Sequence, residues 1–141
     1  MTTLPSTVEF VNPEELAKLI KDKSKVPGKD YVVIDVRGDD FEGGNIPGCV
    51  NVPSGVFVDN LQHLIKEYSQ VPQIVFHCAL SQVRGPKYAR IYREALMLNS
   101  IKTNQKILIL SGGFGEWQRR FKSDVELVEK YDEEFWTYFE G

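Results

Sequence analysis

Three apolar, β-branched runs place the strongest constraint on how this chain can fold. They read YVVIDVR (31–37), QIVFHC (73–78) and KILILS (106–111). Near-continuous apolar runs of this length are typical of strands that are covered on both faces, as in parallel sheets. Segments with helical spacing separate the runs. The alternation of strands and helices predicts an α/β fold with helices on both faces of a parallel sheet.

Helix signals surround these strands. Asn12 is a suitable N-cap, Pro13 suits the first helical position, and Glu15 completes a capping box, which together predict a helix near 13–23. The other predicted elements are helices over 59–69, from Pro86 onward, over 114–121 and within the terminal 132–141, and a short strand over 49–53 after a glycine-rich turn at 39–48. The aromatic residues of the terminal segment are expected to pack on the core.

Length and composition indicate one globular domain over 1–141. The chain is 42% hydrophobic and 26% charged, which is ordinary for a globular protein. A net charge of −3 without a basic patch argues against nucleic acid as a partner. We expect no membrane association, because no apolar run approaches the roughly 20 residues that span a bilayer. The start of the chain does not resemble a signal peptide, so a cytoplasmic or nuclear location is expected.

The chain has two cysteines, Cys49 and Cys78. Two cysteines in a chain of this length do not suggest a disulfide scaffold, so both are expected to be free thiols. The cysteines and histidines lack zinc-ligand spacing. We therefore predict neither a metal site nor a cofactor.

The segment HCALSQVRGP (77–86) carries the strongest chemical signal. Cys78 ends a strand just before a helix, where unpaired N–H groups and the helix dipole favour a thiolate. Five residues then separate it from Arg84, enough to curl their amides round a tetrahedral anion while the guanidinium grips two oxygens. Pro86 suits the start of the following helix. The predicted phosphate-binding loop comprises Ala79, Leu80, Ser81, Gln82, Val83, Arg84 and Gly85.

These features predict covalent catalysis, with Cys78 as the nucleophile and Arg84 stabilising the transition state. A buried core thiol is the alternative for Cys78, but the arginine and Gly85-Pro86 at this spacing favour the catalytic interpretation. The Ser81 hydroxyl could hydrogen-bond the thiolate and help sulfur to leave. It could equally be a turn residue that bonds its own backbone.

Three further residues each have two possible roles. Strand alternation points His77 away from the Cys78 sulfur, so it is expected to be a hydrogen-bonded structural histidine. Asp35 could orient loop groups or Arg37, which is the favoured interpretation, or take part in catalysis. Cys49 could be a resolving thiol but fits core packing better.

HCALSQVRGP resembles the active-site signature of the phosphatase branch of the rhodanese superfamily, which includes the cell-division-cycle dual-specificity phosphatases and related fungal and plant arsenate reductases. VIDVRGDDFEGGNIPGCVNVP (33–53) and LSGGFGEWQ (110–118) are similar to two further motifs of that superfamily. The resemblance implies a rhodanese fold with Cys78 as nucleophile and Arg84 as oxyanion clamp. Sulfurtransferases of the superfamily are expected to have four residues between these two positions, so the longer loop suits phosphate or arsenate.

Two departures from the resembled family stand out. The loop residues 79–83 contain no acid to protonate a leaving group, and Val36 occupies the position of a second, protective cysteine. A general acid would have to come from elsewhere. Asp39, Asp40 and Glu42 lie on a loop that could approach the site.

The first functional hypothesis is a phosphatase that hydrolyses phosphotyrosine, and also phosphoserine or phosphothreonine, in proteins. The runner-up is an arsenate reductase in which glutathione or glutaredoxin resolves the arsenic adduct. The substrate is accordingly a phosphorylated protein or a small oxyanion. A non-catalytic oxyanion-binding module is a third class, and sulfur transfer from thiosulfate to cyanide is a fourth.

Overall fold

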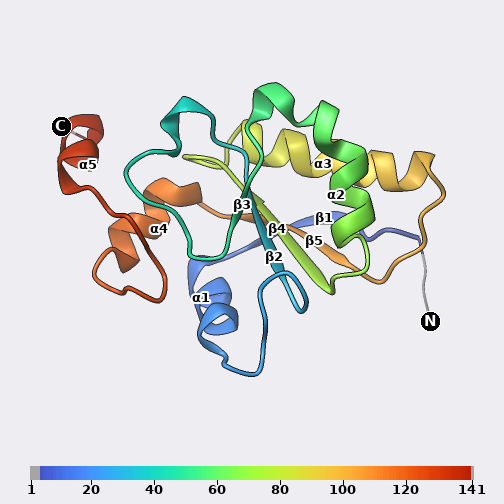
Figure 1. The fold of residues 1–141 in the computed structure, drawn as a ribbon, viewed down its shortest axis with the longest axis horizontal. Helices are drawn as coiled ribbons and strands as arrows, with labels where there is room; N and C mark the ends of the chain where they lie inside the picture. The colour runs from blue at the N-terminus through green and yellow to red at the C-terminus, as the bar shows by residue number, and fades with distance from the viewer. Residues whose placement is uncertain (1–3, 141) are drawn as a thin grey trace.

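A five-stranded parallel sheet lies at the centre of the computed structural model, which describes residues 4–140 (Figure 1). The strands are β1 (Val8–Val11), β2 (Val32–Asp35), β3 (Val50–Asn51), β4 (Gln73–His77) and β5 (Lys106–Leu110). Their order in the sheet is β1-β5-β4-β2-β3, and every neighbouring pair is parallel. The predicted parallel sheet is confirmed, with β4 as its central strand.

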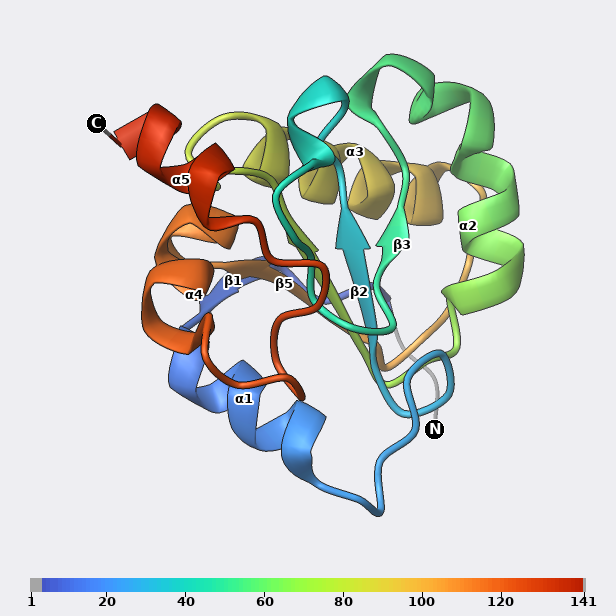
Figure 2. The ribbon, with the colours of Figure 1, turned by 60° about the vertical axis from the view of Figure 1, so that its left-hand side comes forward.

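Helices cover both faces, as predicted (Figures 1 and 2). They are α1 (Pro13–Lys21), α2 (Leu61–Tyr68), α3 (Arg84–Leu98), α4 (Gly113–Phe121) and α5 (Glu133–Glu140), with short 3-10 turns η1 (Asp39–Phe41), η2 (Ser54–Val56) and η3 (Val58–Asn60). Helices α2 and α3 lie on one face, and α1 and α4 lie on the other. No helix among the described residues combines the length and apolar character needed to cross a bilayer.

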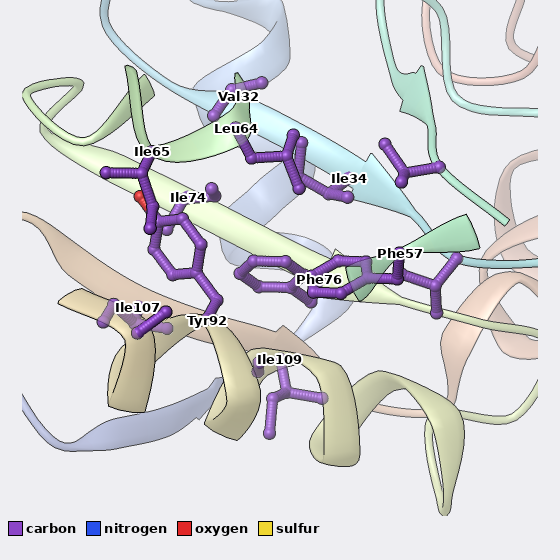
Figure 3. Close-up of a cluster of buried hydrophobic side chains, with 14 of the residues drawn as sticks. Val32, Ile34, Phe57, Leu64, Ile65, Ile74, Phe76, Tyr92, Ile107 and Ile109 are labelled. Atoms are coloured by element: carbon purple, nitrogen blue, oxygen red, sulfur yellow. The ribbon is translucent and has the colours of Figure 1, made fainter. Parts of the chain in front are cut away.

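The core has two halves, one on each face of the sheet. On the α2–α3 side, Phe57, Phe76 and Tyr92 pack together and are fully buried, as Figure 3 shows. On the α1–α4 side, Phe114 and Trp117 are equally buried. Each such side chain contributes about 1.5–3 kcal/mol by leaving water. The two-sided burial explains why the central strands are apolar throughout.

The ends of the elements differ from the sequence-based boundaries. The strands expected over 31–37 and 49–53 shorten to Val32–Asp35 and Val50–Asn51. Strand β1 was not predicted, because it is a half-exposed edge strand and lacks an apolar run. Helix α3 begins at Arg84 instead of Pro86. Proline is tolerated there, since the first four N–H groups of a helix have no partner within it.

The N-cap of α1 agrees with the sequence. Asn12 Oδ1 accepts a hydrogen bond of 2.9 Å from the Glu15 amide, and Pro13 is the first residue of α1. At the other end, the terminal helix α5 is confirmed, and Trp136 packs on Phe114 with its ring 5.8 Å away. Its indole N–H donates to the Gly43 carbonyl at 2.8 Å. The side chains of 138–141, whose aromatics were also expected to pack inward, lie outside the described residues.

Candidate active site

The loop that follows β4 lies at the carboxyl end of the central strand. β4 ends at His77, Cys78 comes next, and α3 begins at Arg84. In parallel sheets the carboxyl ends of the strands are where ligands bind. The fold therefore brings the predicted loop to the expected edge, flanked by the ends of β2 and β5.

Two backbone amides point at the Cys78 sulfur. The amides of Ser81 and Gly85 donate to Sγ over 3.1 and 3.3 Å. Donors aimed at sulfur stabilise its negative form over the neutral thiol. The Ser81 hydroxyl instead accepts from the Cys78 amide at 3.4 Å, which favours the turn interpretation of that side chain. Ser81 has φ +55°, so the chain turns sharply at the midpoint of the loop.

A small pocket opens above the sulfur. Its volume is about 200 Å³, and it is lined by Cys78, Ala79, Leu80, Gln82, Val83 and Arg84. Although Cys78 is only 3% exposed, its place in the pocket lining gives it access from outside. Within residues 4–140, the amides of Leu80, Gln82 and Val83 have no protein acceptor. Because the same three residues line the pocket, their amides are the candidate donors to an anion there.

The start of α4 braces the loop from behind. The amides of Phe114 and Gly115 donate to the carbonyls of Cys78 and Ala79 at 2.9 and 2.8 Å. Gly113 has φ +59°, and a Cβ placed on it would lie 2.6 Å from each of the same two carbonyl oxygens. Only glycine allows so close an approach in this conformation. Gly113, the first residue of α4, thus allows the close contact that fixes the backbone of Cys78 and Ala79.

A fully buried ion pair lies under the loop. Arg37 donates to Asp35 through its amide, Nε and Nη2 at 2.8–3.1 Å, and Nη2 also reaches the Gly44 carbonyl at 2.9 Å. The guanidinium stacks over the Phe114 ring, 4.4 Å from its centroid. Such a pair is satisfied on all sides, as a buried charge requires. Asp35 thus bonds to Arg37, which is the contact that the favoured interpretation of Asp35 requires.

His77 joins this buried group on the side away from the sulfur. Its ring stacks on Phe114, Nδ1 lies 3.1 Å from the Cys78 carbonyl oxygen, and Nε2 lies 3.5 Å from Asp35 Oδ2. Burial lowers the pKa of His77 and outweighs the attraction of Asp35, so the ring is neutral. Burial alone would raise the pKa of Asp35, but the charge of Arg37 and the hydrogen bonds from it, with a further contribution from His77 when that ring is protonated, outweigh burial and lower that pKa.

Arg84 is held at the pocket by an acidic partner that the sequence did not pair with it. Its Nη1 and Nη2 donate to the two carboxylate oxygens of Asp40 at 3.0 and 2.6 Å. The hydrogen bonds from Arg84 lower the pKa of the Asp40 carboxyl, and those to Asp40 raise the pKa of Arg84. Asp39, Asp40 and Glu42 were the acids expected near this loop. Asp40 bonds to Arg84, whereas Asp39 and Glu42 are exposed.

The second cysteine lies elsewhere. Cys49 packs with the core on the α1–α4 side, whereas Cys78 packs with the core on the α2–α3 side. Burial raises the pKa of the Cys49 thiol to about 12. These facts favour core packing over a resolving role. Among residues 4–140, no group of three or more His, Cys, Asp or Glu side chains is placed to hold a metal ion.

Comparison with known proteins places this chain in a family. The rhodanese-like domain family matches residues 12–120. The dual specificity phosphatase ibp1 of Schizosaccharomyces pombe is 32% identical over 142 residues, covering 90% of this chain and 99% of the relative. The arsenical-resistance protein 2 of Saccharomyces cerevisiae is 31% identical over 130 residues, covering 86% of this chain and 97% of the relative. The chain therefore belongs to the rhodanese family, and its relatives include phosphatases and arsenic-resistance proteins.

Solved structures agree on the fold. Ygr203w, described as a yeast protein tyrosine phosphatase of the rhodanese family, matches with a TM-score of 0.75 at 24% identity, over 93% of this chain and 98% of that one. The As-Sb reductase of Leishmania major matches with a TM-score of 0.68 at 24% identity, over 84% of this chain and 81% of that one. At this identity the likeness establishes the fold alone.

Proposed function

We propose that the chain is a single-domain, cysteine-dependent phosphatase that hydrolyses phosphotyrosine, and also phosphoserine or phosphothreonine, in proteins. The observation that supports this most directly is the pair of amides, from Ser81 and Gly85, aimed at the Cys78 sulfur in a pocket edged by Arg84. A thiolate beneath an anion-binding loop is the arrangement that covalent phosphoryl transfer needs. The proposed location is the cytoplasm or the nucleus.

In the proposed reaction, the Cys78 thiolate attacks phosphorus in line with the bond to the leaving oxygen. That bond breaks as the sulfur–phosphorus bond forms, and the leaving oxygen takes up a proton. Loop amides and Arg84 stabilise the equatorial oxygens, and water then hydrolyses the phosphocysteine to phosphate and free thiolate. Since the loop has no acid, an aryl leaving group, which departs readily as a phenolate, should react faster than an alkyl one.

The test is hydrolysis of an aryl phosphate by the purified chain. Cys78→Ser should abolish turnover, because the hydroxyl is a far weaker nucleophile. Arg84→Ala should lower kcat/KM by about 10²–10³-fold through the loss of transition-state stabilisation. Undiminished turnover in Cys78→Ser would rule out the phosphatase proposal.

Arsenate reduction is the second candidate. It is favoured by the acid-free loop and by the similarity to the yeast arsenical-resistance protein. Here the thiolate would attack arsenate and expel a hydroxyl as water. A glutathione or glutaredoxin thiol would then resolve the adduct, so that arsenic(V) gains two electrons and two thiols become a disulfide. An assay with arsenate and glutathione, run beside the phosphatase assay, decides which reaction predominates.

If the chain is a binding module without catalysis, the Cys78 thiol should have the reactivity of an ordinary cysteine. Alkylation with iodoacetamide separates it from both enzymes, since the thiolate is the reactive form. In an enzyme, Cys78 should be modified rapidly at neutral pH and protected by arsenate, while Cys49 stays unmodified because burial raises its pKa to about 12. Slow modification of Cys78 at neutral pH would favour the binding module. We expect little sulfur transfer, since the loop is long for that activity.

A further inference from the structure

We propose that Asp40 is a positioning residue, which holds the Arg84 guanidinium so that its unused edge faces an oxyanion above Cys78. The proposal rests on the proposed function, because it assigns a role within the same anion-binding loop. The carboxylate of Asp40 meets Arg84 end-on, with one oxygen on Nη1 and the other on Nη2. This two-point contact fixes the plane of the guanidinium as well as its position.

The end-on contact leaves donors for a ligand. A guanidinium has five N–H groups, and Asp40 takes one from each terminal nitrogen. Three N–H groups remain: the Nε–H and the second hydrogens of Nη1 and Nη2. The Nε–H and the Nη2 hydrogen form the other fork of the planar group. Arg84 lines the pocket beside the sulfur. A tetrahedral dianion can therefore be gripped on that fork while Asp40 stays in place.

Asp40 is itself anchored to the buried part of the site. Its Oδ1 accepts from the Gly38 amide at 3.1 Å, and its carbonyl accepts from Arg37 Nη1 at 3.3 Å. Arg37 is in turn locked to Asp35 at the end of β2. A continuous series of hydrogen bonds thus connects Asp35 at the end of β2, through Arg37 and Asp40, to Arg84. The η1 turn that carries Asp40 lies beside the loop before α3 (Figure 2).

A competing role for Asp40 makes the opposite prediction. If the carboxylate blocked the pocket by occupying Arg84, removing it would improve anion binding. If it positions Arg84, removing it frees a one-third-exposed side chain to adopt many rotamers, and anion binding weakens. The sign of the change in affinity therefore separates the two roles.

The experiment compares Asp40→Asn with Asp59→Asn, a control that makes the same charge change at an exposed position on η3. Inorganic phosphate binding is measured by calorimetry, and kcat and KM are measured with an aryl phosphate. We expect Asp40→Asn to weaken phosphate binding and to lower kcat/KM by about ten- to a hundredfold, as misplacement of a binding group does. Asp59→Asn should stay within about twofold of wild type in both assays. Unchanged or tighter phosphate binding in Asp40→Asn overturns the proposal.

Two further variants separate positioning from general stabilisation of the fold. Asp40→Glu keeps the carboxylate and should restore part of the affinity. In an Arg84→Lys background, which cannot form the fork, Asp40→Asn should have little further effect, so the double-mutant cycle shows strong coupling. Additive losses contradict positioning through Arg84. If wild type binds phosphate but turns over neither aryl phosphate nor arsenate, the proposed function fails, while phosphate affinity still tests Asp40.

Discussion

Two aspartate–arginine pairs lie next to each other in space, because Arg37 Nη1 donates to the Asp40 carbonyl, and they differ in what surrounds them. Asp35 and Arg37 are two positions apart, and both side chains are fully buried under the loop that follows β4. Asp40 and Arg84 are 44 positions apart, with side chains 28% and 33% exposed at the pocket. Both pairs are bidentate. The first pair is enclosed by protein, whereas the second is partly exposed at the pocket and can contact a ligand there.

The energetic contrast follows from burial. Removing one member of a buried pair leaves a charge without water or partner, which costs about 3–5 kcal/mol. Exposed pairs contribute about 0–1 kcal/mol, since water solvates either partner alone. Mutations on the two sides of the loop should therefore separate stability from function.

The largest effect is expected for Arg37→Met. The change strands the buried Asp35 carboxylate and should lower the free energy of unfolding by about 3–5 kcal/mol, measured by urea denaturation. Arg84→Met is the matched control and should change stability by at most about 1 kcal/mol while impairing phosphate binding. Equal stability losses in both variants would contradict the contrast between a structural buried pair and a partly exposed pair at the pocket.

The next largest effect on stability is expected at Gly113, where α4 contacts the loop after β4. Gly113→Ala would place a Cβ against the carbonyls of Cys78 and Ala79 in a left-handed conformation, at a cost of about 1–3 kcal/mol. Turnover should fall as well, since the backbone under the sulfur must shift. Gly55→Ala is the control, because a Cβ there meets nothing within 4 Å. The same denaturation and activity assays apply, and a fully active Gly113→Ala would show that the brace is dispensable.

The buried residues His77 and Asp35 should make the stability of the fold depend on pH. Because the pKa of buried His77 is lowered, the unfolded chain takes up a proton below about pH 6.5 that the folded chain does not. Stability should therefore fall on acidification from about pH 6.5, with a slope that approaches about 1.4 kcal/mol per pH unit. The lowered pKa of Asp35 adds a second decline, because its contribution is complete above about pH 4 and lost below.

His77→Gln isolates the first decline. In this variant the stability measured by urea denaturation should lose its slope between about pH 6.5 and 5, whatever its absolute value. His63→Gln alters an exposed histidine and should keep the wild-type slope. An undiminished slope in His77→Gln would mean that another group takes up the proton.

The buried group of Asp35, Arg37 and His77 and the exposed pair at the pocket also differ in how far the sequence could predict them. The apolar runs predicted β2, β4 and β5, since strands buried on both faces have a strong signal, and the loop signature predicted Cys78 and Arg84 as neighbours of one pocket. The edge strand β1 was missed, because only one side of it is paired and its residues are half-exposed.

The pairing of Asp40 with Arg84 could not be predicted either. Three acids, Asp39, Asp40 and Glu42, stand close together in the sequence. The η1 turn decides which of them faces the loop, and its geometry depends on Arg37, whose guanidinium bonds the Asp40 carbonyl from the buried side. Local sequence gives the candidates here, and a tertiary contact between distant segments selects among them.

The smallest effect is expected for the exposed apolar residues at the edge of the pocket. Leu80 and Val83 are 59% and 72% exposed, and both line the pocket. An aromatic leaving group would cover part of this apolar rim, whereas an inorganic oxyanion would reach only the amides and Arg84. At about 25 cal/mol per Å², covering a few tens of Å² contributes about 1 kcal/mol, or about fivefold in KM. Leu80→Ser should therefore raise KM for an aryl phosphate about fivefold and leave the affinity for inorganic phosphate unchanged. Val125→Ser, at another exposed valine, is the control. If Leu80→Ser weakened aryl and inorganic phosphate equally, Leu80 would act on the loop conformation and not on the leaving group.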